Sequence, residues 1–178
     1  AENSGYDITF LNNSRLRKDR MSYLEHSLYR GMDGVMIAIA DYKDLEVIEL
    51  LESSLPVVTI DYVFNGRISI MSDNIGGFSE LLEYAYQLGH RKIAYLGSES
   101  IKLFSADRKT GYQLSMLQHD LVAEKKYIIE VNDVYLDECK PLLEMLQSED
   151  RPTAIVVSDD ILAVSLERVC IQCGLSIP

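Results

Sequence analysis

The feature that most constrains the fold is a regular alternation of short apolar runs and segments with helical spacing. Apolar runs at residues 34–40 and 57–60 are separated by a predicted helix over 44–52, with Asp44 as a negative charge at its N-terminus. Connections of this length join parallel strands through a helix. Because the run at 34–40 is apolar without interruption, we expect a strand that is covered on both faces. The alternation predicts an α/β protein with parallel sheets flanked by helices.

The same alternation extends in both directions from these elements. A β-branched and aromatic run at 7–11 predicts a strand, and the apolar positions of 18–29 have helical offsets. After residue 66 the predicted strands are 68–71, 92–96, 127–131 and 154–157, and the predicted helices are 74–88, 106–118, 136–146 and 160–173. Two successive α/β halves predict two lobes of similar construction.

The division between the lobes is predicted near the turn signal Asn65-Gly66. We expect a first α/β lobe over residues 1–66, a crossover over 67–74 and a second lobe over 75–178. Ser72, Asp73 and Asn74 are the cap candidates for the helix that opens the second lobe. Both halves look one element short at the chain ends, so we expect a fragment of a longer protein.

Composition excludes several classes of function. The chain has 178 residues, 47% of them hydrophobic, which is enough to bury an ordinary core. Its net charge of −11 repels phosphate backbones, so we do not expect this segment to grip nucleic acid by itself. No apolar run approaches the ~18 residues of a membrane-spanning helix. Three cysteines without a disulfide framework indicate a reducing cytoplasm.

Motifs that hold metals, cofactors or nucleophiles are missing from the sequence. There is no G-x-x-x-x-G-K-[ST], no G-x-G-x-x-G and no G-x-S-x-G. Cys170 and Cys173 have redox or metal spacing, but they end a helix, where the dipole disfavours a thiolate. The three histidines are scattered and complete no zinc set. We therefore expect no metal and no cofactor, and we interpret the cysteines as structural.

The candidate site residues lie just past predicted strand ends. Asp61 follows 57–60, and Asp159 and Asp160 follow the strand that begins at 154. Arg108 lies in the first turn of the helix after 92–96 and its loop. Ligands of open parallel sheets bind outside the carboxyl ends of the strands, so these side chains are expected to converge on one cleft. The alternatives are an N-cap role for Asp160, solvated loop carboxylates for the other two aspartates, and a surface ion pair for Arg108.

Carboxylates with one guanidinium suit a polyhydroxylated ligand. Carboxylates accept hydrogen bonds from sugar hydroxyls, and a guanidinium donates to ring or hydroxyl oxygens. The same set could serve general acid–base chemistry, but it lacks a nucleophile, a metal cluster and a histidine at a strand end. Binding is therefore favoured over catalysis.

Two glycines have predicted structural roles. In LGHRKIAYLG, Gly89 follows a helix end and is expected to adopt the left-handed conformation. His90 and Arg91 then turn the corner into a strand, at the end opposite the expected cleft. Gly111 lies inside a helix, where it costs about 1 kcal/mol relative to alanine. Close approach of that helix to the sheet would explain its presence.

Eight segments in order resemble the effector-binding core of the LacI/GalR family of bacterial transcription regulators. They are GYDITFLNNS, GMDGVMIAIA, LPVVTIDY, SDNIGG, LGHRKIAYLG, DRKTGY, RPTAIVVSDDILA and ERVCIQCGLSIP. The resemblance implies the type I periplasmic-binding-protein fold, two α/β lobes around a ligand cleft, here incomplete at both ends. It implies a homodimer, a small-molecule effector such as a sugar, and operator DNA bound only through an N-terminal domain that is missing from this chain.

The resemblance also implies roles for individual residues. Asp61 matches an acidic position that often holds a sugar hydroxyl, and Arg108, in R-x-x-G-Y, matches an arginine that commonly contacts the effector. Asp159 matches a position that is often asparagine, so an acceptor-only carboxylate replaces an amide that also donates. Tyr62 is a candidate stacking face for a sugar ring, with a half-buried structural role as the alternative.

The leading hypothesis is the sugar-sensing core of a cytoplasmic, dimeric transcription repressor, in which the effector changes the arrangement of the lobes. A second hypothesis is a solute-binding protein for sugar transport. A third is an α/β enzyme with Asp159 or Asp61 as a base. The residues upstream of Ala1 in the intact gene product discriminate between the first two hypotheses. Because part of the cleft is expected to be missing, residues 1–178 alone should bind ligand weakly.

Overall fold

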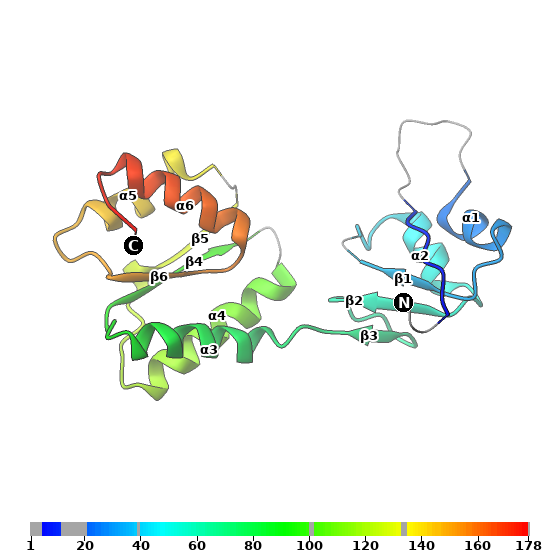
Figure 1. Cartoon of the computed structure of the whole chain (residues 1–178), viewed down its shortest axis with the longest axis horizontal. Coiled ribbons are helices and arrows are strands. Elements are labelled where there is room, and N and C mark those ends of the chain that lie inside the picture. The colour runs from blue at the N-terminus through cyan, green and yellow to red at the C-terminus, as the bar shows by residue number, and fades with distance from the viewer. Residues whose placement is uncertain (1–4, 12–20, 39, 100–101, 133–134, 178) are drawn as a thin grey trace. The chain divides into compact units, whose positions relative to one another are not determined.

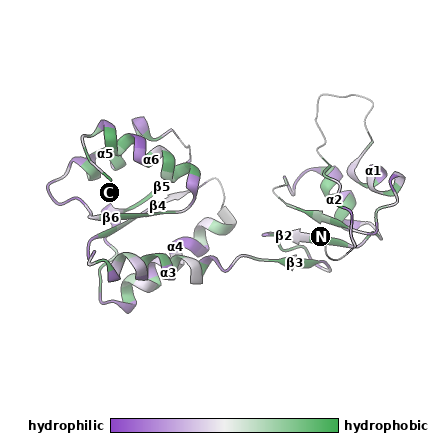
Figure 2. Cartoon of the chain, in the orientation of Figure 1, coloured by the Kyte–Doolittle hydropathy of each residue, from purple (hydrophilic) through white to green (hydrophobic). Residues whose placement is uncertain are grey.

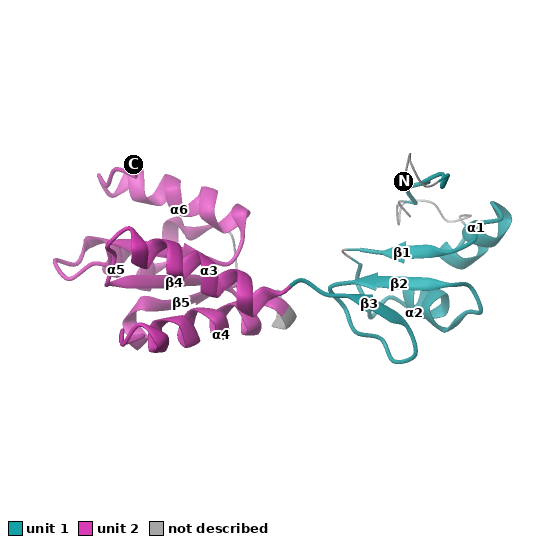
Figure 3. Cartoon of the chain, turned by 60° about the horizontal axis from the view of Figure 1, so that its bottom comes forward, with its two compact units in different colours: residues 1–72 teal, residues 73–178 magenta. Residues whose placement is uncertain are grey.

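The computed structural model describes residues 5–11, 21–38, 40–99, 102–132 and 135–177 (Figure 1). The chain divides into two compact units, residues 1–72 and 73–178 (Figure 3). Each unit holds a three-stranded sheet in which every pair of neighbouring strands is parallel. The α/β class with two parallel-sheet sets and flanking helices is thus confirmed. In the described part of the chain, no helix is long and apolar enough to cross a membrane.

Unit 1, residues 1–72, has a sheet of order β1-β2-β3. Its elements are α1 (Tyr23–Tyr29), β1 (Val35–Ile37), α2 (Leu45–Glu52), β2 (Val57–Ile60) and β3 (Ile68–Ile70). Asp44 is the N-cap of α2 and accepts a hydrogen bond from the Glu46 backbone nitrogen at 3.0 Å. Because β3 pairs with β2, residues 68–70, which the sequence assigns to the crossover, belong to the first sheet.

Arg67 connects the end of α2 to the loop that precedes β3 through hydrogen bonds. Its guanidinium donates to the backbone carbonyl oxygens of Leu51, Ser53 and Leu55, with Nε 2.6 Å from the Leu51 oxygen. These carbonyls lie at the C-terminal end of the helix and just beyond it, where backbone acceptors have no partner within the helix. One charged side chain thus satisfies three acceptors and joins α2 to β3.

Only one face of the unit 1 sheet is covered by the described residues. Ile37 and Thr59 are buried on the face that α2 covers. Met36, Val58 and Ile68 form a row on the opposite face, where the Met36 side chain is 63% and the Ile68 side chain 69% exposed. The expectation that the strand within 34–40 is covered on both faces is therefore wrong for the described chain. Among the residues that the structure describes, no second layer lies above the apolar β1.

The predicted strand at 7–11 is also wrong. The structure describes these residues as irregular chain, and Tyr6, Ile8 and Phe10 are exposed. β-branched and aromatic residues favour a strand where neighbouring strands and a covering layer are present. Among the described residues, this segment pairs with no strand. The predicted helix over 18–29 begins only at Tyr23, and residues 18–20 lie outside the described chain.

Unit 2, residues 73–178, has a sheet of order β5-β4-β6. Its strands are β4 (Ile93–Ser98), β5 (Ile128–Val131) and β6 (Ala154–Val157), and its helices are α3 (Asn74–Gln87), α4 (Lys102–Gln118), α5 (Lys140–Gln147) and α6 (Asp160–Gln172). Short 3-10 helices, Lys125–Tyr127 and Leu136–Glu138, precede β5 and α5. The predicted helix over 136–146 is therefore two shorter elements.

Both faces of the unit 2 sheet are covered. Ile93 and Tyr95 of the central strand β4 pack against α3 and α4, whereas Ala94 and Leu96 pack against α5 and α6. All four side chains are at most 1% exposed. Figure 1 shows the two helix pairs on opposite sides of the sheet, and Figure 2 shows hydrophobic residues along β4. In unit 2 the sequence therefore encodes a sheet between two helical layers.

The two glycines that the sequence singles out occupy tight positions. Gly89 follows the C-cap of α3 with φ +94, the left-handed conformation predicted for it. A Cβ on Gly111 would lie 2.5 Å from the Ile75 carbonyl oxygen and 2.9 Å from the Phe78 Cβ. Gly111 therefore permits α4 to approach helix α3, and the expectation that it faces the sheet is wrong. The reason is that α3 and α4 pack side by side on one face of the sheet.

Candidate functional site

Asp61 lies directly after β2, at the carboxyl edge of the unit 1 sheet. Its φ of +54 is in the left-handed region, which few non-glycine residues adopt. The Asp61 backbone nitrogen donates to the Ile70 carbonyl oxygen at 2.8 Å. Its Oδ1 accepts from both the backbone nitrogen and the hydroxyl of Ser72, each at 2.8 Å. The backbone conformation thus directs the carboxylate toward the chain that leaves β3.

Tyr62 is half-buried and stacks on Tyr42. The two rings are 3.5 Å apart between centroids, with an interplanar angle of 4°. Tyr42 follows β1, so the pair joins the loops after β1 and β2. Burial raises the pKa of the Tyr42 phenol, and Tyr62 and Asp61 raise that pKa further. One face of the Tyr62 ring is therefore already covered by a protein partner.

Arg108 lies in α4 and is held by two acceptors in unit 2. Its Nε donates to the Asn74 Oδ1 at 2.8 Å, and its Nη1 donates to the Ser158 carbonyl oxygen. Asn74 is buried at the start of α3, and Ser158 is buried just past β6. The guanidinium thus joins α3, α4 and the β6–α6 junction. Its role goes beyond that of one partner in a surface ion pair.

Asp159, and not Asp160, is the N-cap of α6. The Asp159 Oδ1 accepts from the Leu162 backbone nitrogen at 2.9 Å, and its Oδ2 accepts from the Ser158 hydroxyl at 2.9 Å. The alternative that gives the cap to Asp160 is wrong. The helix starts one residue earlier than a cap at 160 requires, because Asp159 is extended (φ −155) and Asp160 is already helical.

The structure brings Arg108 and Asp159 together in unit 2. Both line a pocket of only about 10 Å³ at the carboxyl ends of β4 and β6. The other lining residues are Ser98, Phe104, Ser105 and Ser158. Asp61 and Tyr62 lie in unit 1, so each unit carries its own set at the carboxyl edge of its sheet. In unit 2 these polar groups hold one another in place.

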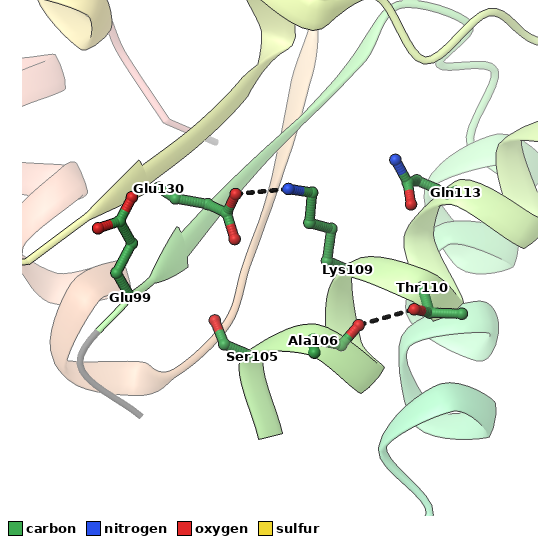
Figure 4. Close-up of a pocket in the computed structure, with 7 residues that line it drawn as sticks. All are labelled: Glu99, Ser105, Ala106, Lys109, Thr110, Gln113 and Glu130. Atoms are coloured by element: carbon green, nitrogen blue, oxygen red, sulfur yellow. Dashed lines mark hydrogen bonds and ion pairs between the residues drawn. The ribbon is translucent and has the colours of Figure 1, made fainter. Parts of the chain in front are cut away.

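A larger, open pocket of about 500 Å³ lies beside α4 (Figure 4). It is lined by Glu99, Ser105, Ala106, Lys109, Thr110, Gln113 and Glu130. Lys109 forms an ion pair with Glu130 across it, with Nζ 2.5 Å from Oε2. None of the predicted effector residues lines this pocket, although Ser105 borders both pockets.

The His90–Arg91 pair is structural. His90 Nδ1 lies 2.9 Å from the Thr153 hydroxyl, and Arg91 donates to the carbonyl oxygens of Tyr86 and His90. The Arg91 guanidinium also lies over the Tyr86 ring, 3.7 Å from its centroid. These contacts fix the turn from α3 into β4, at the end of β4 opposite Arg108.

The cysteines do not form a reactive site in the described chain. Cys139, Cys170 and Cys173 are free thiols, all packed in or against the core under α5 and α6. Burial raises the pKa of the Cys170 thiol, and Cys173 raises that pKa further, which opposes thiolate formation. Among the described residues, no group of three or more histidine, cysteine, aspartate or glutamate side chains could hold a metal ion.

Sequence reasoning missed two partners of the predicted residues. The sequence marks Asn74 only as a helix cap candidate, whereas its side chain holds Arg108. No sequence pattern marks Tyr42, which covers one face of Tyr62. Asn74 is 34 residues from Arg108 along the chain and Tyr42 is 20 residues from Tyr62, so no local pattern reveals either contact.

Comparisons with known proteins identify the family of this chain. The sequence profile of the periplasmic binding protein-like domain matches residues 82–178. The HTH-type transcriptional repressor PurR of Mannheimia succiniciproducens is 28% identical over 180 residues, which cover 98% of this chain and 53% of that protein. The chain thus spans about half the length of the curated relatives it matches.

Solved structures of regulators share the same fold. A regulatory protein of the LacI family from Chloroflexus aggregans superposes with a TM-score of 0.67 at 27% identity, over 85% of this chain and 56% of that one. The transcription regulator CcpA of Lactococcus lactis superposes with a TM-score of 0.63 at 26% identity, over 87% and 57%. These proteins are regulators by name and none is named as an enzyme, in agreement with the prediction of binding over catalysis.

Proposed function

The chain belongs to the periplasmic binding protein-like family, as the effector-binding core of a LacI/GalR-type regulator, and from this premise we propose that it senses a sugar or sugar derivative. The whole protein is then a transcription repressor that acts in the cytoplasm. It binds operator DNA through an N-terminal domain outside this sequence, since the net charge of −11 opposes DNA binding by the core itself.

The single observation that carries this proposal is the placement of Arg108 beside Asp159. α4 and the β6–α6 junction bring the two side chains into one pocket at the carboxyl edge of the unit 2 sheet. In open parallel sheets, this edge is where ligands bind. The Asn74 side chain and the Ser158 carbonyl oxygen hold the guanidinium in place before any ligand arrives, so little side-chain entropy is lost on binding.

The free hydrogen-bonding capacity of this pair suits hydroxyl groups. The hydrogen bonds of Arg108 in the structure use Nε and Nη1, which leaves Nη2 to donate to a ligand oxygen. Each Asp159 oxygen accepts one bond from the protein and keeps a further lone pair. Neighbouring hydroxyls of a sugar both donate and accept, so one ligand could engage both side chains. Within unit 1, we propose Asp61 as an acceptor and Tyr62 as an apolar ring for ligand contacts of their own.

An exposed apolar stripe on α6 supports a homodimer. Ile161, Val164 and Ile171 lie on the helix face opposite the buried Leu162 and Val169, and their side chains are 63%, 67% and 64% exposed. Aligned apolar side chains on a surface helix are typical of a protein–protein contact. A second copy of the same chain is the partner that the family relationship favours.

The proposal is tested by a ligand screen on the intact gene product. We expect a pentose, a hexose or a sugar phosphate to raise its melting temperature, and nucleobases in the same screen to leave it unchanged. Arg108→Ala should abolish the shift, whereas Arg91→Ala, at the opposite end of β4, should preserve it. A response to nucleobases alone would exclude the sugar, and an unchanged shift in Arg108→Ala would remove this arginine from the site.

The regulator part of the proposal has its own test. The residues upstream of Ala1 in the intact gene product should contain a helix-turn-helix pattern. A secretory signal in that place would instead indicate a solute-binding protein for transport.

A further inference from the structure

The open pocket beside α4 has one wall at the carboxyl ends of β4 and β5 (Figure 4). Tyr95 in β4 and Ile128 in β5 pack on the face of the sheet that α3 and α4 cover. Because side chains at even spacing along a strand point to the same face, Glu99 and Glu130 also face α4. The Glu99 backbone nitrogen donates to the Val131 carbonyl oxygen at 2.8 Å, which continues the pairing of the two strands. Two carboxylates from neighbouring chain segments thus lie on one wall.

The opposite wall of the pocket is one side of α4. Ser105, Lys109 and Gln113 follow one another at intervals of four residues, so they lie along the same side of this helix. Ser105 is buried, and its hydroxyl donates to the Ser98 carbonyl oxygen. Lys109 forms the ion pair with Glu130 across the pocket, and the two side chains are only 30% and 28% exposed. The helix therefore presents one ammonium and one amide to the two carboxylates.

The hydrogen-bonding groups of this pocket are only partly used. Among the residues that the structure describes, no hydrogen bond or ion pair involves the Glu99 carboxylate or the Gln113 amide. Glu130 uses Oε2 for Lys109, so its Oε1 keeps its acceptor sites. Two carboxylates lie opposite a single ammonium, so negative charge is in excess on the walls. A ligand with a positive charge would balance this excess.

We propose that this pocket binds a small organic cation through a primary ammonium group. An ammonium has three donors and no acceptor, so it suits the free oxygens of Glu99, Glu130 and the Gln113 amide. The net charge of −11 also raises the concentration of cations near the surface of the chain. The inference is independent of the proposed function, because none of the effector residues proposed above lines this pocket.

The test uses putrescine as the probe and follows the backbone amide signals of the 178-residue chain by NMR. Butane-1,4-diol is the matched neutral control, because it has the same carbon chain with hydroxyls in place of the ammonium groups. Potassium chloride and magnesium chloride at equal ionic strength are the controls for inorganic cations. We expect saturable shifts at residues 106–113 and 128–130 below about 10 mM putrescine, and none with the controls. Equal shifts with the diol or with either salt would overturn the proposal, and so would an absence of shifts with putrescine.

Three substitutions assign the binding to this pocket, and dispersed amide spectra establish that each variant is folded. Glu99→Gln should weaken putrescine binding about tenfold, because one charge-assisted hydrogen bond is lost. Glu144→Gln removes the same charge from an exposed position in α5, on the other face of the sheet, and should leave the affinity unchanged.

Lys109→Met gives the test a result of opposite sign. It removes the ammonium that occupies Glu130 and keeps an unbranched side chain, so putrescine should bind about threefold more tightly. Weaker binding in Lys109→Met would overturn the proposal, because the pocket would then depend on the lysine and not on free carboxylates. An equal loss of affinity in Glu99→Gln and Glu144→Gln would also overturn it, because net charge alone would then attract the probe.

Discussion

Each unit has a three-stranded sheet of parallel strands, but the two units differ in how their sheets are covered. In unit 2, helices cover both faces of β4, and Ile93, Ala94, Tyr95 and Leu96 are at most 1% exposed. In unit 1 the described helices cover one face, and Met36 remains 63% exposed on the other. Apolar strand sequence alone therefore does not specify a buried strand. A strand is buried on both faces only where a second helical layer covers the sheet.

This difference also separates the units energetically. The hydrophobic contribution to folding scales with the apolar area removed from water, at roughly 25 cal/mol per Å². Unit 2 gains this contribution on both faces of its sheet, whereas the described residues of unit 1 supply it on one face. We therefore expect unit 2 to have the more stable core. We expect the stability of unit 1 to depend more on side-chain hydrogen bonds such as those of Arg67 and Asp61.

The largest expected effect compares a core residue of unit 2 with an exposed strand residue of unit 1. Leu96→Ala should lower the free energy of unfolding of unit 2 by about 2–5 kcal/mol, because it leaves a cavity in a closed core. Met36→Ala should change the stability of unit 1 by no more than about 0.5 kcal/mol, because its side chain is already in water. Urea titrations followed by amide signals assigned to each unit measure both. Equal losses would mean that the open face of unit 1 is covered in solution.

The next effect probes the close contact between α3 and α4 in unit 2. Gly111→Ala should destabilise unit 2 by about 1–2 kcal/mol, because overpacking against the Ile75 carbonyl outweighs the gain in helix propensity. Gly77→Ala is the matched control in α3. A Cβ there meets nothing within 4 Å, so about 0.5–1 kcal/mol of stabilisation is expected. Thermal unfolding of the two variants should shift in opposite directions, and shifts of the same sign would contradict the packing described.

The third prediction concerns the hydrogen bonds that Arg67 makes in unit 1. Arg67→Ala removes three hydrogen bonds from a charged donor and leaves carbonyl oxygens at the end of α2 without that partner. The expected loss in the stability of unit 1 is about 1–3 kcal/mol. Arg67→Lys should recover little of it, because one ammonium does not have the fork geometry that reaches three carbonyls. Full recovery in the lysine variant would show that charge alone matters at this position.

The smallest effect is electrostatic and belongs to unit 2. Hydrogen bonds from Lys126, Lys92 and Tyr127 hold the pKa of Asp150 well below its ordinary value of 3.8. A carboxyl group with a lowered pKa stabilises the folded state above that ordinary value, and the contribution disappears as pH falls through the folded pKa. Asp150→Asn should therefore lower the urea midpoint slightly at pH 7 and much less at strongly acidic pH. High salt should shrink the difference, since these side chains are exposed to solvent. If the difference in urea midpoint between the parent chain and Asp150→Asn grew as the pH falls, this prediction would be contradicted.

Strand and helix order was predictable from the sequence because it depends on local patterns. The runs that became β2 and β6, the N-terminal charge of α2 at Asp44 and the turn at Gly89 all follow from neighbouring residues. The failures at 7–11 and at Met36 have one cause. Whether an apolar segment is paired and covered depends on chain that is distant in sequence.

The candidate site was predictable only in part, for a similar reason. The position of Arg108 and Asp159 past strand ends followed from the alternation and from the family resemblance. The expectation that these two side chains converge also holds, but the contacts that hold them did not follow from the sequence, because they depend on Asn74 and on the start of α6 at Asp160. Aspartates 159 and 160 are adjacent, and only the backbone conformation shows which of them caps the helix.

The central claim is the proposal that the effector binds at the carboxyl edge of the unit 2 sheet, at Arg108 and Asp159. Amide hydrogen exchange of the intact gene product, with and without the compound found in the ligand screen, tests it most directly. We predict that the ligand slows exchange at residues 158–162, at the start of α6. Unchanged exchange in this segment, or slowing only around the pocket beside Lys109, would contradict the claim.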